Sequence, residues 1–471
     1  MLHVSTRGEA PAIGFTEALL TGLARDGGLY VPETWPSLSR DAIGGFAGQR
    51  YAEAAKAVLS PLMAGEIPAA ALDRMIEESY ASFRHPAVCP LTQLGDNLFV
   101  LELFHGPTLA FKDVAMQLLG RLMDHALKAR GTRATIVGAT SGDTGSAAVE
   151  AFRGLDQVDI FILYPHGRVS DVQRRQMTGV DAPNVHAIAV EGTFDDCQNA
   201  VKAMFNHARF REELHLSGVN SINWARVAAQ AVYYFTSAVA LGSPHRPVSF
   251  SVPTGNFGDI LAGWAAKQMG LPIERLMIGT NANDILARAL GSGSYEIRGV
   301  QPTASPSMDI QISSNFERLL FEAYGRDGAA VRRLMGSLSQ SRAFLIDAEP
   351  LSRIRQDFGA VAVDEPSVAE EMQQTYRETG YVLDPHTAVG TRAARRLLAE
   401  RPEVPVIALA TAHPAKFPDA VERATGLRPK LPPHLADLLD RPERFTVLPN
   451  EQGAIERFIR ERARAVRGVA A

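Results

Sequence analysis

Cysteine and lysine are both scarce in this 471-residue chain. The two cysteines, Cys89 and Cys197, are too few for a disulfide framework, and no cluster of residues has metal-ligand spacing. This usage is typical of a reducing compartment, so we expect a cytoplasmic protein without a bound metal. Only seven of the 48 basic residues are lysines, at positions 56, 112, 128, 202, 267, 416 and 430.

Long hydrophobic runs and a strong net charge are also missing. No segment approaches the roughly 20 apolar residues needed to span a bilayer, and residues 1–8 contain no apolar run behind a basic start. The formal net charge of −4 at pH 7 is no reason to expect nucleic acid as a partner. We therefore expect a globular protein of two or three domains that binds neither a membrane nor nucleic acid.

Beyond residue 90, short apolar runs alternate with amphipathic stretches. The runs predicted to be strands are 98–103, 134–138, 160–164, 185–190, 248–253, 276–280 and 406–410. Helical stretches are predicted at 114–128, 145–152, 224–241 and 260–269. This alternation predicts an α/β fold with mostly parallel sheets, helices on both faces and functional sites at the carboxyl ends of the strands.

The two ends of the chain have a different character. Residues 1–90 hold turn signals and then a helical stretch at 51–83 that Pro61 and Pro68 should break, so we expect a mainly helical N-terminal region. An Arg/Glu-rich stretch at 451–467 predicts a solvated closing helix. The expected division is 1–90, 91–130 plus 240–425 as a large domain, 131–239 as a small domain, and 426–471 as a C-terminal closing segment.

One of the scarce lysines follows apolar residues at the predicted start of a helix. The segment is Phe104-His105-Gly106-Pro107-Thr108-Leu109-Ala110-Phe111-Lys112-Asp113. Desolvation disfavours the ammonium form, and a lysine held in this way becomes a nucleophilic amine that can form a Schiff base with a carbonyl cofactor. The alternative is a lysine that extends from the helix start into solvent or pairs with Asp113.

A glycine-flanked turn joins the predicted strand 248–253 to the helix 260–269. Its sequence is Val252-Pro253-Thr254-Gly255-Asn256-Phe257-Gly258-Asp259. Glycines at a helix N-terminus let backbone N–H groups converge on an anion, which the helix dipole also favours. The turn can therefore hold a phosphate. Alternatively, its glycines only allow close packing of the strand and the helix.

A second strand-to-helix turn is rich in hydroxyl groups. Its sequence is Gly138-Ala139-Thr140-Ser141-Gly142-Asp143-Thr144-Gly145-Ser146-Ala147-Ala148. Hydroxyl and amide groups at a helix start suit a carboxylate. Alternatively, Ser141 or Thr144 only caps the helix.

Three further segments carry polar groups at predicted helix starts or after strands. Asn220-Ser221-Ile222-Asn223-Trp224-Ala225-Arg226 offers a guanidinium that can bind a phosphate bidentately, or else a capped helix with an exposed arginine. Ala410-Thr411-Ala412-His413-Pro414-Ala415-Lys416-Phe417 follows a strand. Asp384-Pro385-His386-Thr387 has the pattern of an N-cap followed by proline in the first turn.

Five separate segments, in their order along the chain, resemble those of threonine synthases, pyridoxal-phosphate enzymes of fold type II. The resemblance runs from residue 4, where Val4-Ser5-Thr6-Arg7-Gly8 matches the family's N-terminus, to about residue 417. It implies two open, mostly parallel sheets flanked by helices, with the cofactor on the large domain and the substrate on the small one. The implied cofactor is pyridoxal 5'-phosphate.

The resemblance also implies which residues bind the cofactor. Lys112 holds it as a Schiff base and then serves as the base. The phosphate lies on the turn of Thr254, Gly255, Asn256, Phe257 and Gly258, and Thr411 faces the pyridine nitrogen. At position 143 related enzymes commonly have Asn against the phenolic oxygen. Asp143 would repel a phenolate there unless a proton is shared.

The implied substrate is O-phospho-L-homoserine, which the family converts with water to L-threonine and phosphate, the last step of threonine biosynthesis. The candidate substrate-binding residues are Thr108, Thr140, Ser141, Thr144, Ser221, Asn223 and Arg226. Alternatives are a lyase that releases 2-oxobutyrate from the same substrate, a serine/threonine dehydratase, which a phosphate-binding Arg226 disfavours, and a non-catalytic protein on the same fold. The oligomeric state stays open between monomer and homodimer.

Overall fold

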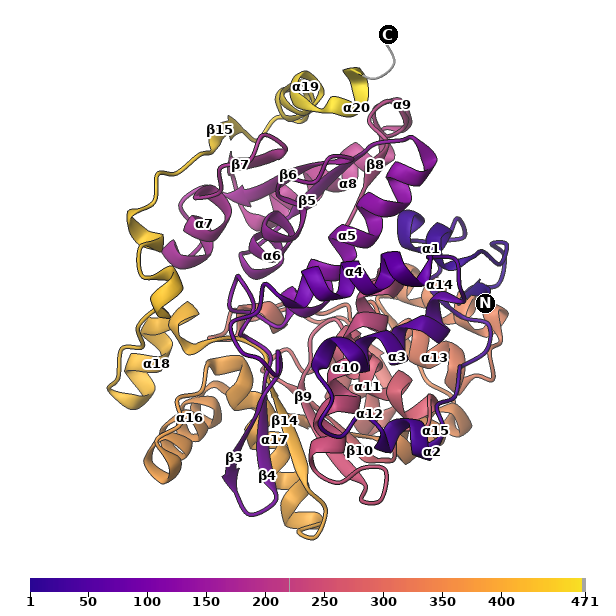
Figure 1. The fold of residues 1–471 in the computed structure, drawn as a ribbon, viewed down its shortest axis with the longest axis vertical. Coiled ribbons are helices and arrows are strands. Elements are labelled where there is room, and N and C mark those ends of the chain that lie inside the picture. The colour runs from indigo at the N-terminus through magenta and orange to yellow at the C-terminus, as the bar shows by residue number, and fades with distance from the viewer. Residues whose placement is uncertain (220, 468–471) are drawn as a thin grey trace. The chain divides into compact units, whose positions relative to one another are not determined.

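The chain divides into two compact units, each with its own sheet (Figure 1). The computed structural model describes residues 1–219 and 221–467. The first unit consists of Met1–Leu19, Leu23–Phe111 and Ser221–Pro429, and the second of Leu20–Gly22, Lys112–Asn220 and Lys430–Ala471.

The first unit is built on a six-stranded sheet in the order β13-β10-β9-β14-β4-β3. All neighbouring strands are parallel except β3 and β4, which pair antiparallel. The strands are β3 (Leu91–Gly95), β4 (Leu98–Glu102), β9 (Val248–Pro253), β10 (Ile273–Thr280), β13 (Phe358–Ala362) and β14 (Val406–Ala410). The predicted strands β4, β9, β10 and β14 are confirmed, whereas β3 and β13 were not predicted.

Helices cover both faces of this sheet. Successive residues of a strand point to opposite faces. Met277 of β10 packs in one core cluster with residues of α17 (Pro385–Glu400). Its neighbour Leu276 instead faces Gly263 of α11 (Gly258–Gln268), where an added Cβ would lie 3.0 Å from the leucine Cδ2. The predicted two-sided covering of a mostly parallel sheet is therefore confirmed.

The N-terminal region, apart from Leu20–Gly22, belongs to the first unit. Val31 of β2 (Tyr30–Pro32), which pairs with β1 (His3–Ser5), is buried against Phe321 and Val331 of later helices. The region is mainly helical, as predicted, but Pro61 does not break it, because α3 (Tyr51–Met63) runs through Pro61 and ends two residues later. Pro68 does precede the next helix. The other helices are α1 (Phe15–Thr21), α2 (Arg40–Gly44) and α4 (Ala69–Tyr80).

The first unit also contains further helices and a two-stranded antiparallel ribbon. The helices are α10 (Trp224–Ala240), α12 (Ile285–Ser292), α13 (Phe316–Ala323), α14 (Gly328–Ser341), α15 (Ala348–Asp357), α16 (Glu365–Thr379) and α18 (Pro418–Thr425). A small antiparallel ribbon joins β11 (Ser294–Glu296) to β12 (Ala343–Leu345).

The second unit has a five-stranded sheet in the order β15-β7-β6-β5-β8, with every pair parallel. The strands are β5 (Ala134–Ala139), β6 (Val158–Pro165), β7 (Val185–Glu191), β8 (Leu216–Ser217) and β15 (Thr446–Pro449). The helices are α5 (Lys112–Arg130), α6 (Asp143–Phe152), α7 (Asp171–Thr178), α8 (Phe194–Asn206), α9 (Ala208–Glu213), α19 (Gln452–Arg462) and α20 (Arg464–Arg467). The three predicted central strands, β5 to β7, are confirmed.

The C-terminal helix was predicted wrongly in two respects. Residues 451–467 form two helices, α19 and α20, separated by Ala463 in an extended conformation. The helix is also not solvated all round, because Ile455 and Ile459 are fully buried in a core cluster with Phe161 of β6. The many Arg and Glu residues of the segment conceal a narrow apolar stripe at i, i+4 spacing.

The division into units differs from the expected four-part division. The C-terminal segment contributes strand β15 and helix α19 to the second unit, because their pairing with β7 and their apolar stripe complete its sheet and core. Helix α5 also falls in the second unit, whereas α10 falls in the first, where it packs against α11 and α3.

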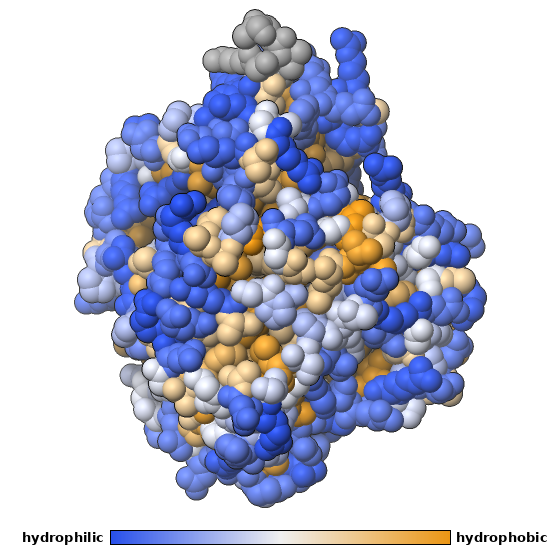
Figure 2. All heavy atoms as spheres, turned by 45° about the vertical axis from the view of Figure 1, so that its right-hand side comes forward, coloured by the Kyte–Doolittle hydropathy of each residue, from blue (hydrophilic) through white to orange (hydrophobic). Residues whose placement is uncertain are grey.

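The molecular surface mixes polar and apolar side chains. On the face drawn in Figure 2, hydrophobic residues lie in separate groups among hydrophilic ones. Among the described residues, no helix combines the length and the hydrophobicity that a membrane span requires.

The buried stripe of α19 makes a testable prediction. Ile459→Ala should lower the free energy of unfolding by about 2–4 kcal/mol, because it removes a fully buried side chain from a packed core. Arg457→Ala, at an exposed position of the same helix, should change it by less than about 0.5 kcal/mol. Urea unfolding followed by circular dichroism measures both. Equal effects of the two variants would contradict the packing of α19.

Candidate active site

The residues just before Lys112 are joined to the loop that follows β14. Two hydrogen bonds and a β-bridge connect residues 109–111 to residues 411–413. They are Phe111 N–H to the Thr411 carbonyl at 2.9 Å, His413 N–H to the Leu109 carbonyl at 3.0 Å, and the antiparallel bridge between Ala110 and Ala412. Two segments singled out separately in the sequence therefore form one bonded framework.

A second, buried lysine strengthens the same framework. Lys416 is fully buried, and its Nζ donates to the Thr108 carbonyl at 2.7 Å. The next residue, Leu109, has a positive φ of 62°, which is uncommon for a residue other than glycine, and its side chain is buried. The candidates Thr108 and Thr411 are both buried within this framework.

Lys112 is the first residue of α5 and is only 8% exposed. Its Nζ lies 3.5 Å from Oδ2 of Asp143, the first residue of α6. The prediction of a desolvated lysine at a helix start is confirmed, and the alternative of a lysine that extends into solvent is wrong.

The carboxylate of Asp143 has a second partner that the sequence did not reveal. Gln173 of α7 donates from Nε2 to Asp143 Oδ1 at 2.9 Å. Ser170, the N-cap of α7, in turn donates from Oγ to Gln173 Oε1 at 2.9 Å. Asp143 is thus held between an amide and an amine.

The three hydroxyl candidates of the second turn have different surroundings. Thr140 is buried, and its Oγ1 accepts from the N–H groups of Gly142 and Gly145, both at 2.9 Å. Thr140, rather than Ser141 or Thr144, therefore satisfies the start of α6. Ser141 is exposed and Thr144 is partly exposed in the first turn.

The glycine-flanked turn lies where β9 ends and α11 begins. Thr254 is buried and bonded to the backbone. Its N–H donates to the Gly279 carbonyl at 2.8 Å, and its hydroxyl donates to the Val252 carbonyl at 2.7 Å. A Cβ added to Gly255 would lie 3.2 Å from the carbonyl oxygen of Ser307. Close approach of two backbone segments therefore explains this glycine.

The left-handed residue of this turn is Phe257 and not a glycine. Its φ is +65°, and it immediately precedes α11. A left-handed conformation costs about 1–2 kcal/mol for an L-residue. The ring is 1% exposed and lies against Phe316 and Phe358, with centroids 5.3 and 5.7 Å apart, and this burial offsets the cost. Tertiary packing thus sets the direction of the start of α11.

Asn223 is confirmed as the N-cap of α10. Its Oδ1 accepts from the Ala225 N–H at 3.0 Å, while its Nδ2 donates to the Leu19 carbonyl at 2.8 Å. The side chain is 1% exposed. Both ends of this amide are therefore used within the protein.

Arg226 lies in the first turn of α10 and is only 4% exposed. The alternative of an exposed arginine is therefore wrong. Loss of hydration lowers the pKa of the guanidinium to about 10, so the group stays protonated at neutral pH. Ser221, just before the helix, is partly exposed.

The Asp384-Pro385 pair caps α17, as predicted. The Asp384 carboxylate accepts from the N–H groups of His386 and Thr387 at 2.9 and 3.2 Å. The same carboxylate contacts His386 Nδ1 at 2.8 Å, and His386 Nε2 accepts from the Ser307 N–H at 3.2 Å. His386 thus connects the cap to the backbone that faces Gly255.

Some of the candidate residues follow the carboxyl ends of parallel strands within each unit. In the second unit, the turn after β5 brings Asp143 to Lys112. In the first unit, Thr254 follows β9 and Thr411 follows β14, two adjacent strands. This edge is where α/β sheets carry their ligand sites.

Three family models match the chain. "Threonine synthase N terminus" matches residues 2–80, "Pyridoxal-phosphate dependent enzyme" matches 87–412, and "Threonine synthase, C-terminal" matches 387–459. Together these matches cover nearly the whole chain.

Individual proteins and structures are similar over the same length. The threonine synthase of Pseudomonas aeruginosa is 53% identical over 460 residues, which are 98% of each chain. The crystal structure of threonine synthase with bound pyridoxal phosphate from Brucella melitensis has a TM-score of 0.96 and 61% identity, covering 98% of this chain and 100% of that one. The yeast threonine synthase structure has a TM-score of 0.94 and 42% identity, covering 98% of both chains.

Proposed function

The chain belongs to the threonine synthase family, and on that premise we propose that it converts O-phospho-L-homoserine and water to L-threonine and inorganic phosphate. This is the last step of threonine biosynthesis. The observation that carries the proposal is the buried Lys112 at the start of α5, with Nζ 3.5 Å from a carboxylate. A buried amine at a helix start is what a carbonyl cofactor needs for a covalent link.

The described residues fit pyridoxal phosphate, the cofactor of this family. Lys112 would hold its aldehyde carbon, and Thr411 would face the pyridine nitrogen. Its phosphate would lie on the turn at the start of α11, formed by Thr254, Gly255, Asn256, Phe257 and Gly258. When bound, the cofactor delocalises the negative charge that develops on the substrate.

In this proposal Lys112 moves the protons at Cα and Cβ of the substrate. Asp143 stabilises the ammonium form of Lys112 after each proton is taken up, because its Oδ2 lies beside Nζ. Gln173 keeps the carboxylate in this orientation through its bond to Oδ1. Asp143 is also our proposed neighbour of the cofactor's phenolic oxygen, where a proton from Lys112 would remove the repulsion between two anions.

The substrate-binding residues remain those proposed from the sequence. Arg226 would bind the distal phosphate, because its guanidinium keeps its charge although buried. The turn at the start of α6 would bind the α-carboxylate through the exposed Ser141 and the partly exposed Thr144. Thr108, Thr140, Ser221 and Asn223 complete the candidates. Of these, Thr140 and Asn223 also cap helices, so a ligand would bind their remaining side-chain donors or their backbone N–H groups.

The cellular setting is part of the same proposal. Both cysteines are buried and free, as is usual for proteins of a reducing cytoplasm, where we place the protein. Sedimentation would distinguish a monomer from a homodimer.

Lys112→Ala tests the assignment directly. The parent should convert phosphohomoserine to threonine and phosphate, identified by mass spectrometry, and the variant should show no turnover above background, because it lacks the proton-transfer group. The release of 2-oxobutyrate by the parent would identify the lyase alternative instead. Lys128→Ala, at an exposed lysine of the same helix, is the matched control and should keep full activity.

Gly255→Val should weaken cofactor binding. Its Cβ would press on the carbonyl of Ser307 and on Cα of Met308, 3.3 Å away, and would displace the turn whose N–H groups hold the phosphate. We expect the dissociation constant of pyridoxal phosphate to rise by about tenfold or more, equivalent to roughly 1.4 kcal/mol. Gly291→Val, where an added Cβ meets no atom within 4 Å, is the control. If the variant loses only substrate affinity, the two anion sites are interchanged.

Arg226→Ala should separate substrate binding from cofactor binding. The loss of a charge-assisted, bidentate contact should cost roughly 2–4 kcal/mol, or about 30-fold to 1,000-fold in kcat/KM. The visible absorbance of the bound cofactor should stay, and Arg226→Lys should rescue activity only in part. A kcat/KM within about twofold of the parent would show that the phosphate is bound elsewhere.

A further inference from the structure

Three buried polar residues lie at the start of α13, in no segment that the sequence singled out. Ser313, Asn315 and Arg318 are 3%, 0% and 1% exposed. Asn315 is the N-cap of α13, and Arg318 lies in its first turn. Polar side chains this deeply buried are costly unless each finds its partners, so their partners indicate their role. We call these three the clip residues.

The clip residues bind the carbonyl groups of the turn that precedes α11. Ser313 donates from Oγ to the Gly255 carbonyl at 2.7 Å. Asn315 donates to the Asn256 carbonyl twice, from Nδ2 at 3.0 Å and from its backbone N–H at 3.1 Å. Two consecutive carbonyls of the proposed phosphate turn therefore point toward the clip residues.

Asn315 and Arg318 also bind two consecutive carbonyls of the segment that precedes α10. Asn315 Nδ2 also donates to the Ser221 carbonyl at 3.1 Å. Arg318 donates from Nη2 to the Ile222 carbonyl at 2.6 Å and from Nη1 to Oδ1 of Asn315. One amide group thus bridges the two turns, and the arginine holds that amide in place.

The orientation of these carbonyls determines the orientation of the next N–H groups. In a planar trans peptide the C=O and N–H bonds point in opposite directions. The four anchored carbonyls therefore direct four N–H groups away from the clip residues. These belong to Asn256, Phe257, Ile222 and Asn223, all at the start of α11 or α10.

Arg318 and Ser313 have further partners of their own. Arg318 donates from Nε to the Tyr30 carbonyl at 2.9 Å, and its guanidinium lies 5.8 Å from the centroid of the Trp224 ring. Tyr295 accepts through its hydroxyl oxygen from the Ser313 N–H at 2.8 Å. The support is therefore tertiary and comes from several elements.

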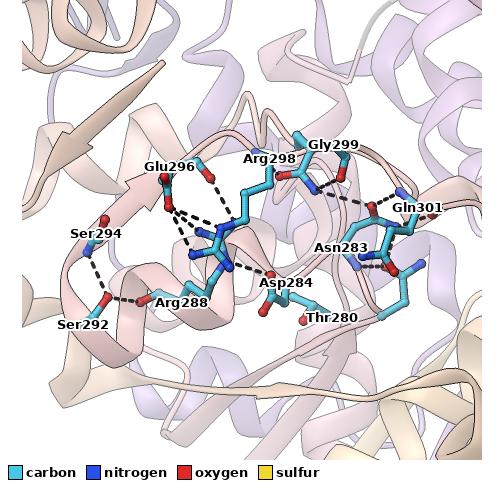
Figure 3. A network of polar contacts seen from close by, with 12 residues as sticks. Thr280, Asn283, Asp284, Arg288, Ser292, Ser294, Glu296, Arg298, Gly299 and Gln301 are labelled. Atoms are coloured by element: carbon cyan, nitrogen blue, oxygen red, sulfur yellow. Dashed lines mark hydrogen bonds and ion pairs between the residues drawn. The ribbon is translucent and has the colours of Figure 1, made fainter. Parts of the chain in front are cut away.

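The chain that leads to Ser313 is anchored by a polar network after β10. Asn283 and Gln301 exchange two hydrogen bonds of 2.9 Å, as Figure 3 shows. Gln311 adds bonds to the backbone of Gly299 and Arg298, at 3.3 and 3.1 Å. The segment that leads to Ser313 is therefore held by hydrogen bonds at both ends, so it can fix the positions of two neighbouring turns.

We propose that Ser313, Asn315 and Arg318 are positioning residues that orient the two anion-binding turns of the first unit and fix their spacing. The turn from Gly255 to Gly258 takes the cofactor phosphate, and the turn from Ser221 to Arg226 takes the substrate phosphate. The inference rests on the proposed function for the identity of the two anions. Asn315 couples the turns, whereas Ser313 acts on the first alone.

Asn315→Asp is the principal test. The substitution keeps the size of the side chain and the acceptor for Arg318, but it replaces the bridging donor by an oxygen that faces two carbonyl oxygens. We expect the dissociation constant of pyridoxal phosphate, from absorbance titration of the apoprotein, and the KM for phosphohomoserine each to rise by about tenfold or more. The ³¹P resonance of the bound cofactor should shift as well.

Asn184→Asp is the matched control. Asn184 is 1% exposed, and its Nδ2 donates to the carbonyls of Phe152 and Val158 at 2.8 and 2.9 Å, next to the amino end of β7. Like Asn315→Asp, the substitution replaces an amide donor by an oxygen that faces two carbonyl oxygens, but it does so away from the carboxyl edges of the sheets. It should lower the melting temperature. The dissociation constant of pyridoxal phosphate and the KM for phosphohomoserine should both stay within about twofold of the parent values.

Ser313→Ala distinguishes positioning from general destabilisation. It removes only the donor to Gly255, so cofactor affinity should fall severalfold while the KM stays unchanged. If Asn315→Asp does not fold, the cofactor affinities of Ser313→Ala and Asn315→Ser test the inference instead.

Two results would overturn the inference: unchanged cofactor affinity in both Asn315→Asp and Ser313→Ala, or equal effects of Asn315→Asp and Asn184→Asp on binding. If the parent binds pyridoxal phosphate but does not turn over phosphohomoserine, the proposed function fails. The cofactor dissociation constants of the variants then decide the inference on their own.

Discussion

The backbone pairing of residues 109–111 with residues 411–413 is the constraint on which the rest of the site depends. It joins the turn before α5 to the loop after β14, a strand near the middle of the six-stranded sheet. The pairing ends at Phe111, so it fixes the backbone of the first unit up to the residue that precedes Lys112. Main-chain hydrogen bonds of this kind depend little on the side chains involved.

A second constraint is that many polar side chains of the site already serve the backbone. Thr140 and Asn223 cap helices, and the Thr254 hydroxyl bonds the carbonyl of Val252. These bonds occupy part of the hydrogen-bonding capacity of each side chain, so less of it is left for a ligand. In the proposed function, anions bind chiefly to backbone N–H groups at helix starts and to the charged Arg226. In that case, residues that orient peptide groups affect binding through those N–H groups.

The outline of the fold was predictable because its strands are short, buried and rich in apolar residues. All seven predicted strands are present, and the glycine-flanked turn was correctly placed between β9 and α11. The errors have local causes. Helix α3 runs through Pro61 for two more residues, and the charged composition of 451–467 concealed the buried Ile455 and Ile459. Strand β13 was missed because Gly and Ala are weak strand signals.

The sequence by itself determined the local chemistry: a scarce lysine at a helix start, a glycine turn before another helix, and an aspartate cap with proline in the first turn of α17. These features depend on neighbours within a few residues, so their pattern is visible in the chain. Only the tertiary structure decided the bond of Gln173 to Asp143, the burial of Arg226 and the bridge of Asn315 between two turns. These partners come from segments that are far apart in the chain, and the packing of sheets and helices brings them together. A single sequence does not show which distant segments will meet.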